Sequence, residues 1–171
     1  MSGILQSLFG IVIGCLLWPF FEYFVHGILS HRFKTPVSPL HWGHHIHLQS
    51  VFTPALAWVP VTLILTSLFV WAFGKLIGLG LASGLLLGFF HYEYCHWRIH
   101  FKEPKNSHQQ KLRDHHLAHH FRNPKAYFGV TTILCDRLFG SLTASAEEDY
   151  AAASKRHPLG LYVDDKNKKA A

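Results

Sequence analysis

The sequence predicts an all-α protein with about three membrane-spanning helices and a cytoplasmic helical cap that carries a histidine-rich site for two metal ions. Composition is the first observation behind this prediction. Of the 171 residues, 49% are hydrophobic and only 15% are charged, whereas about 25% are charged in a typical soluble domain. The second observation is that long uncharged segments fill most of the first hundred residues. The third is that most of the 15 histidines fall into four short motifs.

Composition also excludes several classes of protein. An aromatic content of 15% excludes a largely disordered chain. Cys15, Cys95 and Cys135 are odd in number and widely spaced, which excludes a disulfide-stapled scaffold. The formal net charge is +6, and 12 of the 16 basic residues follow residue 100. Positive charge beside apolar segments typically sets membrane orientation and contacts anionic headgroups, so we expect no nucleic-acid partner.

The first predicted span lies near the N-terminus. Residues 4–21 are 18 residues without a charge, which is enough to cross about 30 Å of hydrocarbon. No basic segment precedes them and no small-residue cleavage site follows, so a signal peptide is not expected. We expect this span to end near His26. Gly10 and Gly14 lie four residues apart and would let another helix approach closely.

Residues 51–90 predict two further spans. These 40 residues contain one charge, Lys75, and would form about 60 Å of helix, twice the thickness of a bilayer. The segment therefore divides into spans at roughly 52–73 and 76–95, with a turn at residues 73–75. Gly80, Gly84 and Gly88 recur every four residues along one face. Core helices of a soluble protein, the alternative, would show a polar face, and these do not.

Three spans place all the histidine motifs on one face of the membrane. Arg32, Lys34, Arg98 and the basic C-terminal region mark that face as cytoplasmic, in a bacterial cytoplasmic membrane or the endoplasmic reticulum. We divide the chain into a membrane di-metal domain, 1–142, and a partly flexible tail, 143–171, in which 144–153 form a short exposed helix or loop. Lys168 and Lys169 resemble a dilysine retrieval signal, with a plain solvated tail as the alternative.

The histidines that we expect to bind metal form two pairs and two triplets. In chain order they are His26 and His31; His41, His44 and His45; His96 and His100; and His116, His119 and His120. Positions i, i+3 and i+4 share one face of a helix, so each triplet is expected to direct its three imidazoles at one place. The first pair, five residues apart, requires a helix end between its members, and Gly27 suits such an end.

Ten clustered imidazoles indicate two metal ions, because neutral imidazole is the commonest metal-binding side chain and ten donors exceed what one ion takes. No cysteine joins the motifs, so a thiolate zinc site or an iron–sulfur cluster is not expected. Zinc, copper, iron and nickel all suit such ligands. Three classes of function then compete: a dinuclear redox enzyme, a structural zinc protein, and a metal carrier or sensor. A carrier would need ligands across the bilayer, and a structural site usually has four ligands.

Three carboxylates stand just before motif histidines. Glu22 precedes His26 by four residues, and Glu93 precedes His96 by three. We expect each to accept a hydrogen bond from its imidazole, because a carboxylate within a span needs a partner. Asp114 is expected to do the same for His116. The remaining histidines are not predicted ligands, and the roles of two of them, His47 and His91, stay open; the others are His108, His115 and His157.

These motifs are similar to those of the sterol desaturase/fatty acid hydroxylase superfamily of integral-membrane, non-haem di-iron enzymes. The resemblance extends from residue 21 to residue 142. It includes Glu22-Tyr23-x2-His26-x4-His31, His41-Trp42-Gly43-His44-His45 and Tyr92-Glu93-x2-His96-Trp97-x2-His100. The most specific block is His115-His116-Leu117-Ala118-His119-His120-Phe121, followed by Phe128-Gly129-Val130-Thr131 and Asp136-Arg137-Leu138-Phe139-Gly140.

The resemblance implies that the ten histidines hold two iron ions, with zinc possible in a purified form, and that O2 is a co-substrate. It implies an enzyme that hydroxylates or desaturates a C–H bond of a membrane lipid with a fatty-acyl or sterol-like chain. Electrons would come from a separate donor protein. Carotenoid hydroxylases are the alternative for the substrate, and a non-catalytic zinc-binding membrane protein is the alternative of a different class. The oligomeric state stays open.

Overall fold

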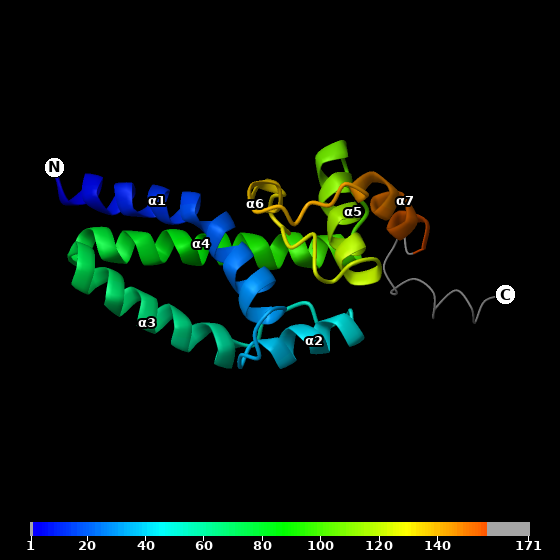
Figure 1. Cartoon of the computed structure of the whole chain (residues 1–171). Coiled ribbons are helices and arrows are strands. Elements are labelled where there is room, and N and C mark those ends of the chain that lie inside the picture. The colour runs from blue at the N-terminus through cyan, green and yellow to red at the C-terminus, as the bar shows by residue number, and fades with distance from the viewer. Residues whose placement is uncertain (1, 157–171) are drawn as a thin grey trace.

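The architecture is all-helical, as predicted, in a computed structural model that describes residues 2–156 (Figure 1). Helices and connecting loops account for this whole range, which contains no strand. The elements are α1 (Gly3–Tyr23), the π-helix η1 (Phe24–Ser30), α2 (Ser38–Ile46), α3 (Ala55–Phe73), α4 (Lys75–Phe101), α5 (Ser107–Phe121), α6 (Leu134–Leu138) and α7 (Ala146–Arg156).

Three helical segments are long and apolar enough to cross a membrane, which confirms the predicted number of spans. They are Gly3–Ser30, Ala55–Phe73 and Lys75–Phe101, with 28, 19 and 27 residues. The predicted turn between the second and third is present at Gly74, whose φ of 78° favours glycine. The third segment is longer than predicted. At 27 residues it measures about 40 Å, so its last turns extend beyond a hydrocarbon layer of about 30 Å.

Small residues join α1 to α4. Gly10 and Gly14 of α1 face Gly80 and Gly84 of α4; the sequence predicted close packing at both patterns, but not that they contact each other. A Cβ atom on Gly10 would lie 2.5 Å from the carbonyl oxygen of Ile77, and 3.0 Å from the Cα atom of Gly80. The two backbones are therefore in direct contact, and no larger side chain fits between them.

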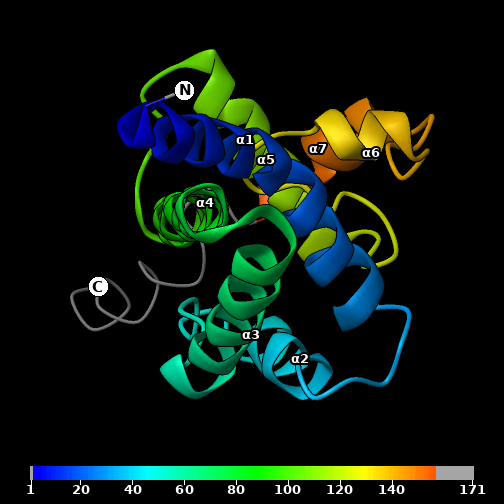
Figure 2. The ribbon, with the colours of Figure 1, turned by 90° about the vertical axis from the view of Figure 1, so that its left-hand side faces the viewer.

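Helix α3 lies on a different side of α4 from α1 (Figure 2). It runs antiparallel to α4 and diverges from it toward its own N-terminal end (Figure 1). None of its residues is buried, and large apolar side chains such as Leu56 and Trp71 are 88% and 85% exposed. Such a surface requires lipid around it, in agreement with a membrane span and not with a soluble core helix.

The remaining helices form a cap at the end of the bundle where α1 and α4 finish (Figure 1). Helix α7 packs on α5 through a core that includes Leu117, Ala118, Tyr150 and Ala153. The short exposed helix or loop expected at 144–153 is helical from Ala146, but one face of it is buried, because the small alanine side chains let α7 lie closely against α5. The domain boundary at residue 142 stays a prediction, and the suggested retrieval signal lies outside the described residues.

Candidate metal centre

The ten predicted ligand histidines lie together at the cap end of the bundle. They come from five segments: His26 from η1, His31 from the turn after it, His41, His44 and His45 from α2, His96 and His100 from the end of α4, and His116, His119 and His120 from α5. All are buried or half-buried. The histidine motifs thus converge, and the role of each histidine as a metal ligand stays a prediction.

The imidazoles form two groups. In the first, which we call the His26 cluster, the ligand nitrogens of His26, His31, His41 and His119 lie within 4.8 Å of one another. In the second, the His96 cluster, the same holds for His44, His96, His100, His116 and His120. His45 adjoins the first group, with its Nε2 atom 2.9 Å from that of His41 and 3.1 Å from that of His119.

The two triplets do not act as the sequence predicted. In α2, His41 and His45 face the His26 cluster, whereas His44 faces the His96 cluster. In α5, His116 and His120 belong to the His96 cluster and His119 to the other. Each triplet therefore divides into an i, i+4 pair and one separate residue. The helices run between the two clusters, so neighbouring positions on one face belong to different clusters.

The π-helix replaces the helix end that was expected at Gly27. The helix continues through η1 to Ser30, and the rings of His26 and His31 lie with centroids 5.5 Å apart. The wider π turn brings residues five apart to the same side, which an α-helix does not do. Gly27 serves close packing instead, because a Cβ atom there would lie 2.8 Å from the ring of Phe128.

The spacing of the imidazoles fits metal ions. Neighbouring Nε2 atoms lie 2.7–3.2 Å apart, as in the pairs His31–His41 and His26–His119. Bonds of about 2.0–2.1 Å to a shared ion separate adjacent ligand nitrogens by about 2.9–3.4 Å. Where Nδ1 carries the proton, Nε2 presents a lone pair. Facing lone pairs repel one another unless a cation lies between them, so the arrangement suits a bound metal.

Burial keeps the cap histidines neutral at physiological pH. It lowers the pKa of His31 and of His44 to about 4, and that of His45 to about 3, with His31 and His44 adding to the effect. The pKa values of the more deeply buried rings are also well below the usual range for the same reason; these are His41, His116, His119 and His120. Neutral imidazole is the form that binds metal.

Main-chain carbonyls fix three of the rings. The Nδ1 atom of His26 donates to the carbonyl of Phe128 at 2.5 Å, and that of His119 to Ala126 at 2.7 Å. Between these two carbonyls, Tyr127 has a φ of 63°, which is uncommon for a residue with a side chain. This left-handed turn directs carbonyls 126 and 128 at different rings. In the other cluster, Nδ1 of His96 donates to Val51 at 2.9 Å.

The predicted carboxylate contacts are wrong in detail. Glu22 accepts hydrogen bonds from Trp18, Val130 and Thr131. Glu93 accepts from Thr53. The Nδ1 positions of His26 and His96 are taken by the carbonyls described above, because a main chain approaches each ring more closely than the glutamate side chain of the same helix.

Asp114 also bonds elsewhere. It accepts from Gln110 at 2.8 Å and from Ser154 of α7, and not from His116, whose Nδ1 atom has no partner among the described residues. At position 114 the side chain points toward α7. Its role is therefore to join α5 to α7.

Asp136 fixes the loop that carries the carbonyls of Ala126 and Phe128. It belongs to one of the sequence motifs, but the sequence predicted no role for it. Its carboxylate accepts from the main-chain N–H groups of Phe128 and Gly129 at 2.8 and 2.7 Å, from Ser141 at 2.6 Å and from His115 at 2.9 Å. Burial alone would raise the pKa of Asp136, but the bonds from His115 and Ser141 bring it below the usual value.

The other histidines lie outside both clusters. His115 is fully buried and bonds to Asp136 and, through Nδ1, to the hydroxyl of Tyr150 at 2.7 Å. His47, His91 and His108 are exposed. His157 lies outside the described residues. None of the described histidines outside the ten predicted ligands thus belongs to either cluster, and their non-ligand role stays a prediction.

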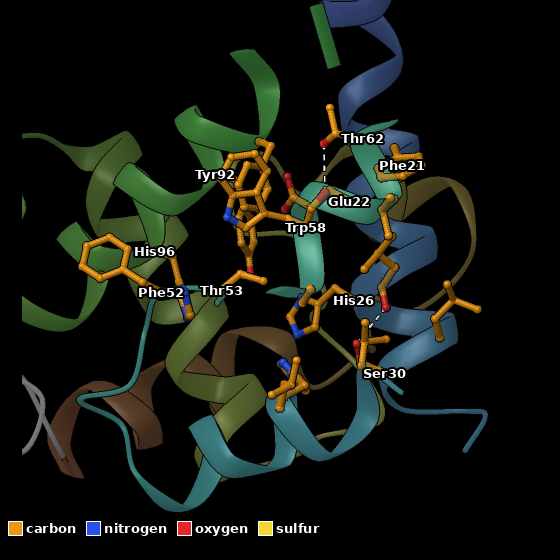
Figure 3. A pocket seen from close by; sticks show the side chains of 18 of the residues that line it. Phe21, Glu22, His26, Ser30, Phe52, Thr53, Trp58, Thr62, Tyr92 and His96 are labelled. Carbon is orange, nitrogen blue, oxygen red and sulfur yellow. Dashed lines mark hydrogen bonds between the residues drawn. The ribbon is translucent and has the colours of Figure 1, made fainter. Parts of the chain in front are cut away.

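An apolar pocket leads from the membrane level to the two clusters (Figure 3). Its cavity volume is about 400 Å³, and α1, η1, α2, α3 and α4 all contribute to its wall. Two histidines of each cluster line one end of the pocket: His26 and His41 of the first, and His44 and His96 of the second. Leu65 and Ala82 lie in the wall contributed by the spans. In Figure 3, Thr62 lies toward the top of the view and His26 lies below it. The pocket therefore joins an apolar wall contributed by the spans to imidazoles of both clusters.

Comparisons with known proteins agree with the motifs. The sequence model of the fatty acid hydroxylase family matches residues 11–141. The chain is 35% identical over 145 residues to fatty acid 2-hydroxylase of Mus musculus, covering 77% of this chain and 38% of that protein. It is 33% identical over 147 residues to dihydroceramide fatty acyl 2-hydroxylase FAH1 of Arabidopsis thaliana, covering 77% and 60%. The chain thus spans between about two fifths and three fifths of these relatives.

A solved structure shares the fold. The hydroxylase domain visible in full-length Scs7p superimposes with a TM-score of 0.65 at 24% sequence identity, covering 80% of this chain and 56% of that one. The helical architecture with its membrane-level bundle and cap is therefore that of a known domain.

Proposed function

This chain belongs to the fatty acid hydroxylase family, and on that premise we propose that it is a membrane enzyme that hydroxylates a C–H bond of a lipid acyl chain, with O2 as co-substrate. One observation carries the proposal: an apolar pocket at membrane level ends on histidines of two clusters, each with the spacing of metal ligands. A reaction at an unactivated carbon needs this combination of a redox-active centre and a water-poor site for the substrate.

The pocket supports an acyl chain as substrate. Its lining along α4 runs from Ala82 to His96, which is about 21 Å of helix. The histidine end lies beside the cap, where a polar headgroup meets water, and the other end lies among the apolar spans. A lipid bound this way presents a carbon near its polar end to the clusters. The names of the relatives, fatty acid 2-hydroxylase and dihydroceramide fatty acyl 2-hydroxylase, agree with this placement.

We propose two iron ions as the resident metals, one held by each cluster. The iron pair would supply activation of O2 and removal of a substrate hydrogen. The chain's own contribution is positional. The neutral imidazoles present Nε2 to the metals. The carbonyls of Phe128, Ala126 and Val51 fix the rings whose Nδ1 atoms donate to them. Apolar side chains such as Phe89 and Leu85 keep water from the bound acyl chain.

We further propose that the cap faces the cytoplasm and receives electrons from a separate donor protein. Lys102, Lys105 and Lys111 are exposed on the cap side, and a basic surface attracts an acidic partner. Changing all three to glutamate should slow turnover with the natural donor and leave turnover with a small chemical reductant unchanged. Equal rates with the natural donor would reject this docking surface.

Lipid profiling tests the proposed activity. Cells that express the protein should accumulate hydroxylated fatty acyl lipids by mass spectrometry, and 18O2 should label the new hydroxyl group. The variants His44→Ala and His119→Ala each remove one donor from a different cluster, so both should lose metal and product. Purified protein with two irons and O2 consumption supports the enzyme. Tightly held zinc with no product in iron-replete cells would support a non-catalytic zinc protein instead, and product from both variants would refute the assignment.

A further inference from the structure

The two glutamates of the spans lie in corresponding positions relative to the two clusters. Glu22 precedes His26 of the first cluster by one helical turn, and Glu93 precedes His96 of the second by one turn. Both glutamates are buried, with 3% and 8% exposure. Neither touches its histidine, and each instead binds a loop from elsewhere in the chain.

The first loop is attached to α1 and η1 at two points. The N–H of Val130 donates to Glu22 at 2.5 Å, and the N–H and hydroxyl of Thr131 also donate to this carboxylate. Two residues before Val130, the carbonyl of Phe128 accepts the Nδ1 proton of His26. The glutamate thus holds the loop by its N–H groups, and the loop holds the imidazole by a carbonyl.

The second loop repeats this arrangement on α4. The N–H of Thr53 donates to Glu93 at 3.1 Å and its hydroxyl at 2.7 Å. Two residues before Thr53, the carbonyl of Val51 accepts from Nδ1 of His96 at 2.9 Å. Figure 3 shows Glu22, Thr53, His26 and His96 around the same pocket.

The common geometry has a simple physical basis. Two residues of chain reach up to about 6.6 Å, which is enough to bridge the 5.4 Å pitch between one turn of a helix and the next. Each loop is hydrogen-bonded both to the glutamate and to the imidazole, so it fixes the direction of the ring. It also fixes the tautomer, because a carbonyl only accepts a hydrogen bond and Nδ1 must therefore carry the proton. The Nε2 lone pair is then directed into the cluster.

We propose that Glu22 and Glu93 are positioning residues that act separately, each tuning one metal site through its own loop and histidine. This inference rests on the proposed two-metal centre. In the His96 cluster, the buried Nδ1 atoms of His100, His116 and His120 have no partner among the described residues. The orientation of His96 by its loop is therefore not duplicated at those three rings. The loss of a group that orients a metal-bound histidine typically weakens metal affinity 10–100-fold.

Titration of the full chain in detergent with Zn²⁺, against a chromogenic chelator, tests the separation. Wild type should bind two ions. Glu22→Gln should weaken one of them by about 10–100-fold and leave the other unchanged, and Glu93→Gln should do the same to the other ion. The two isosteric variants are matched controls for each other. Thr131→Val and Thr53→Val remove one donor to each carboxylate and should give smaller shifts in the same directions, which covers the case in which a glutamate variant does not fold.

Crossed variants identify which ion responds. In His26→Ala, whose remaining ion belongs to the His96 cluster, adding Glu22→Gln should leave the Zn²⁺ affinity unchanged, whereas adding Glu93→Gln should weaken it. Equal weakening of both ions by either glutamate variant, or no weakening by either, overturns the inference. Wild type that binds fewer than two Zn²⁺ overturns the inference together with the two-metal proposal. Two separable ions without any lipid product would refute the proposed function and leave the positioning roles standing.

Discussion

Replacing one glycine at the contact of α1 with α4 should lower stability by an amount that follows from the geometry. A Cβ atom on Gly84 would lie 2.8 Å from the Cα atom of Gly14 and 2.8 Å from the nitrogen of Cys15, whereas ordinary contacts begin at 3.4 Å. The carbonyl oxygen of Ile11 would lie closer still to this Cβ atom, so Gly84→Ala requires the helices to separate by more than about 0.6 Å. Overpacking of this kind costs about 1–3 kcal/mol, which corresponds to a fall in Tm of about 2–12 °C for a chain of this size.

The same substitution in α2 provides a control with the opposite sign. Gly43 lies within that helix, and a Cβ atom there would have nothing within 4 Å. Gly43→Ala should raise stability by about 0.8–1 kcal/mol, because alanine has the higher helix propensity. Thermal unfolding of both variants in one detergent, followed by circular dichroism, compares them directly.

The contact also affects the two histidine clusters, since α1 leads into η1 with His26 while α4 carries His96. Gly84→Ala should therefore lower the metal content per folded protein as well as Tm. A variant as stable and as metal-rich as wild type would refute the claim that direct backbone contact sets the spacing of the two helices.

Three further predictions concern the cap and the pocket. Burial lowers the pKa of His44 to about 4 from the 6.5 of an unfolded chain, so the unfolded state takes up the proton first as the pH falls. Metal-free protein should therefore lose about 2 kcal/mol of stability between pH 7 and pH 5 through this residue, measured by denaturant unfolding, and a flat profile would contradict this. Asp136→Asn weakens a fully buried set of hydrogen bonds and should lower stability by at least about 2 kcal/mol; Ser141→Ala, which removes one donor to it, should cost less. Ala82→Phe should shift products toward shorter acyl chains in a lipid profile, and an unchanged chain-length distribution would show that Ala82 does not contact the substrate.

Side-chain patterns predicted the parts of the site that depend on helix periodicity. The spans follow from the length of the uncharged segments and the glycine stripes from a four-residue repeat, and the structure contains both. The division of the triplets was not predictable in this way, because His41 and His44 share a face of α2. Which cluster each joins depends on how α2 lies against α5, and that arrangement is tertiary.

The orienting groups were beyond sequence reasoning for a different reason. The carbonyls of Val51, Ala126 and Phe128 belong to the main chain, which every residue has, so no residue type in the sequence indicates their role. The carboxylates Glu22 and Glu93 were recognised as relevant from their positions in apolar segments, yet direct contact with the histidines was the wrong geometry. A one-turn offset in sequence cannot distinguish a direct hydrogen bond from one relayed by a distant loop.

The π-helix has a consequence for how this chain tolerates deletions. In an α-helix, residues five apart differ by about 140° around the axis, so His26 and His31 would diverge if η1 became α-helical. Removing a single residue between them would let η1 (Phe24–Ser30) rewind into the ordinary form and regain its favoured hydrogen-bond ladder. The two imidazoles would then lie four residues apart and share one face of an ordinary helix, so this deletion should preserve the pair that straightening the full-length segment would separate.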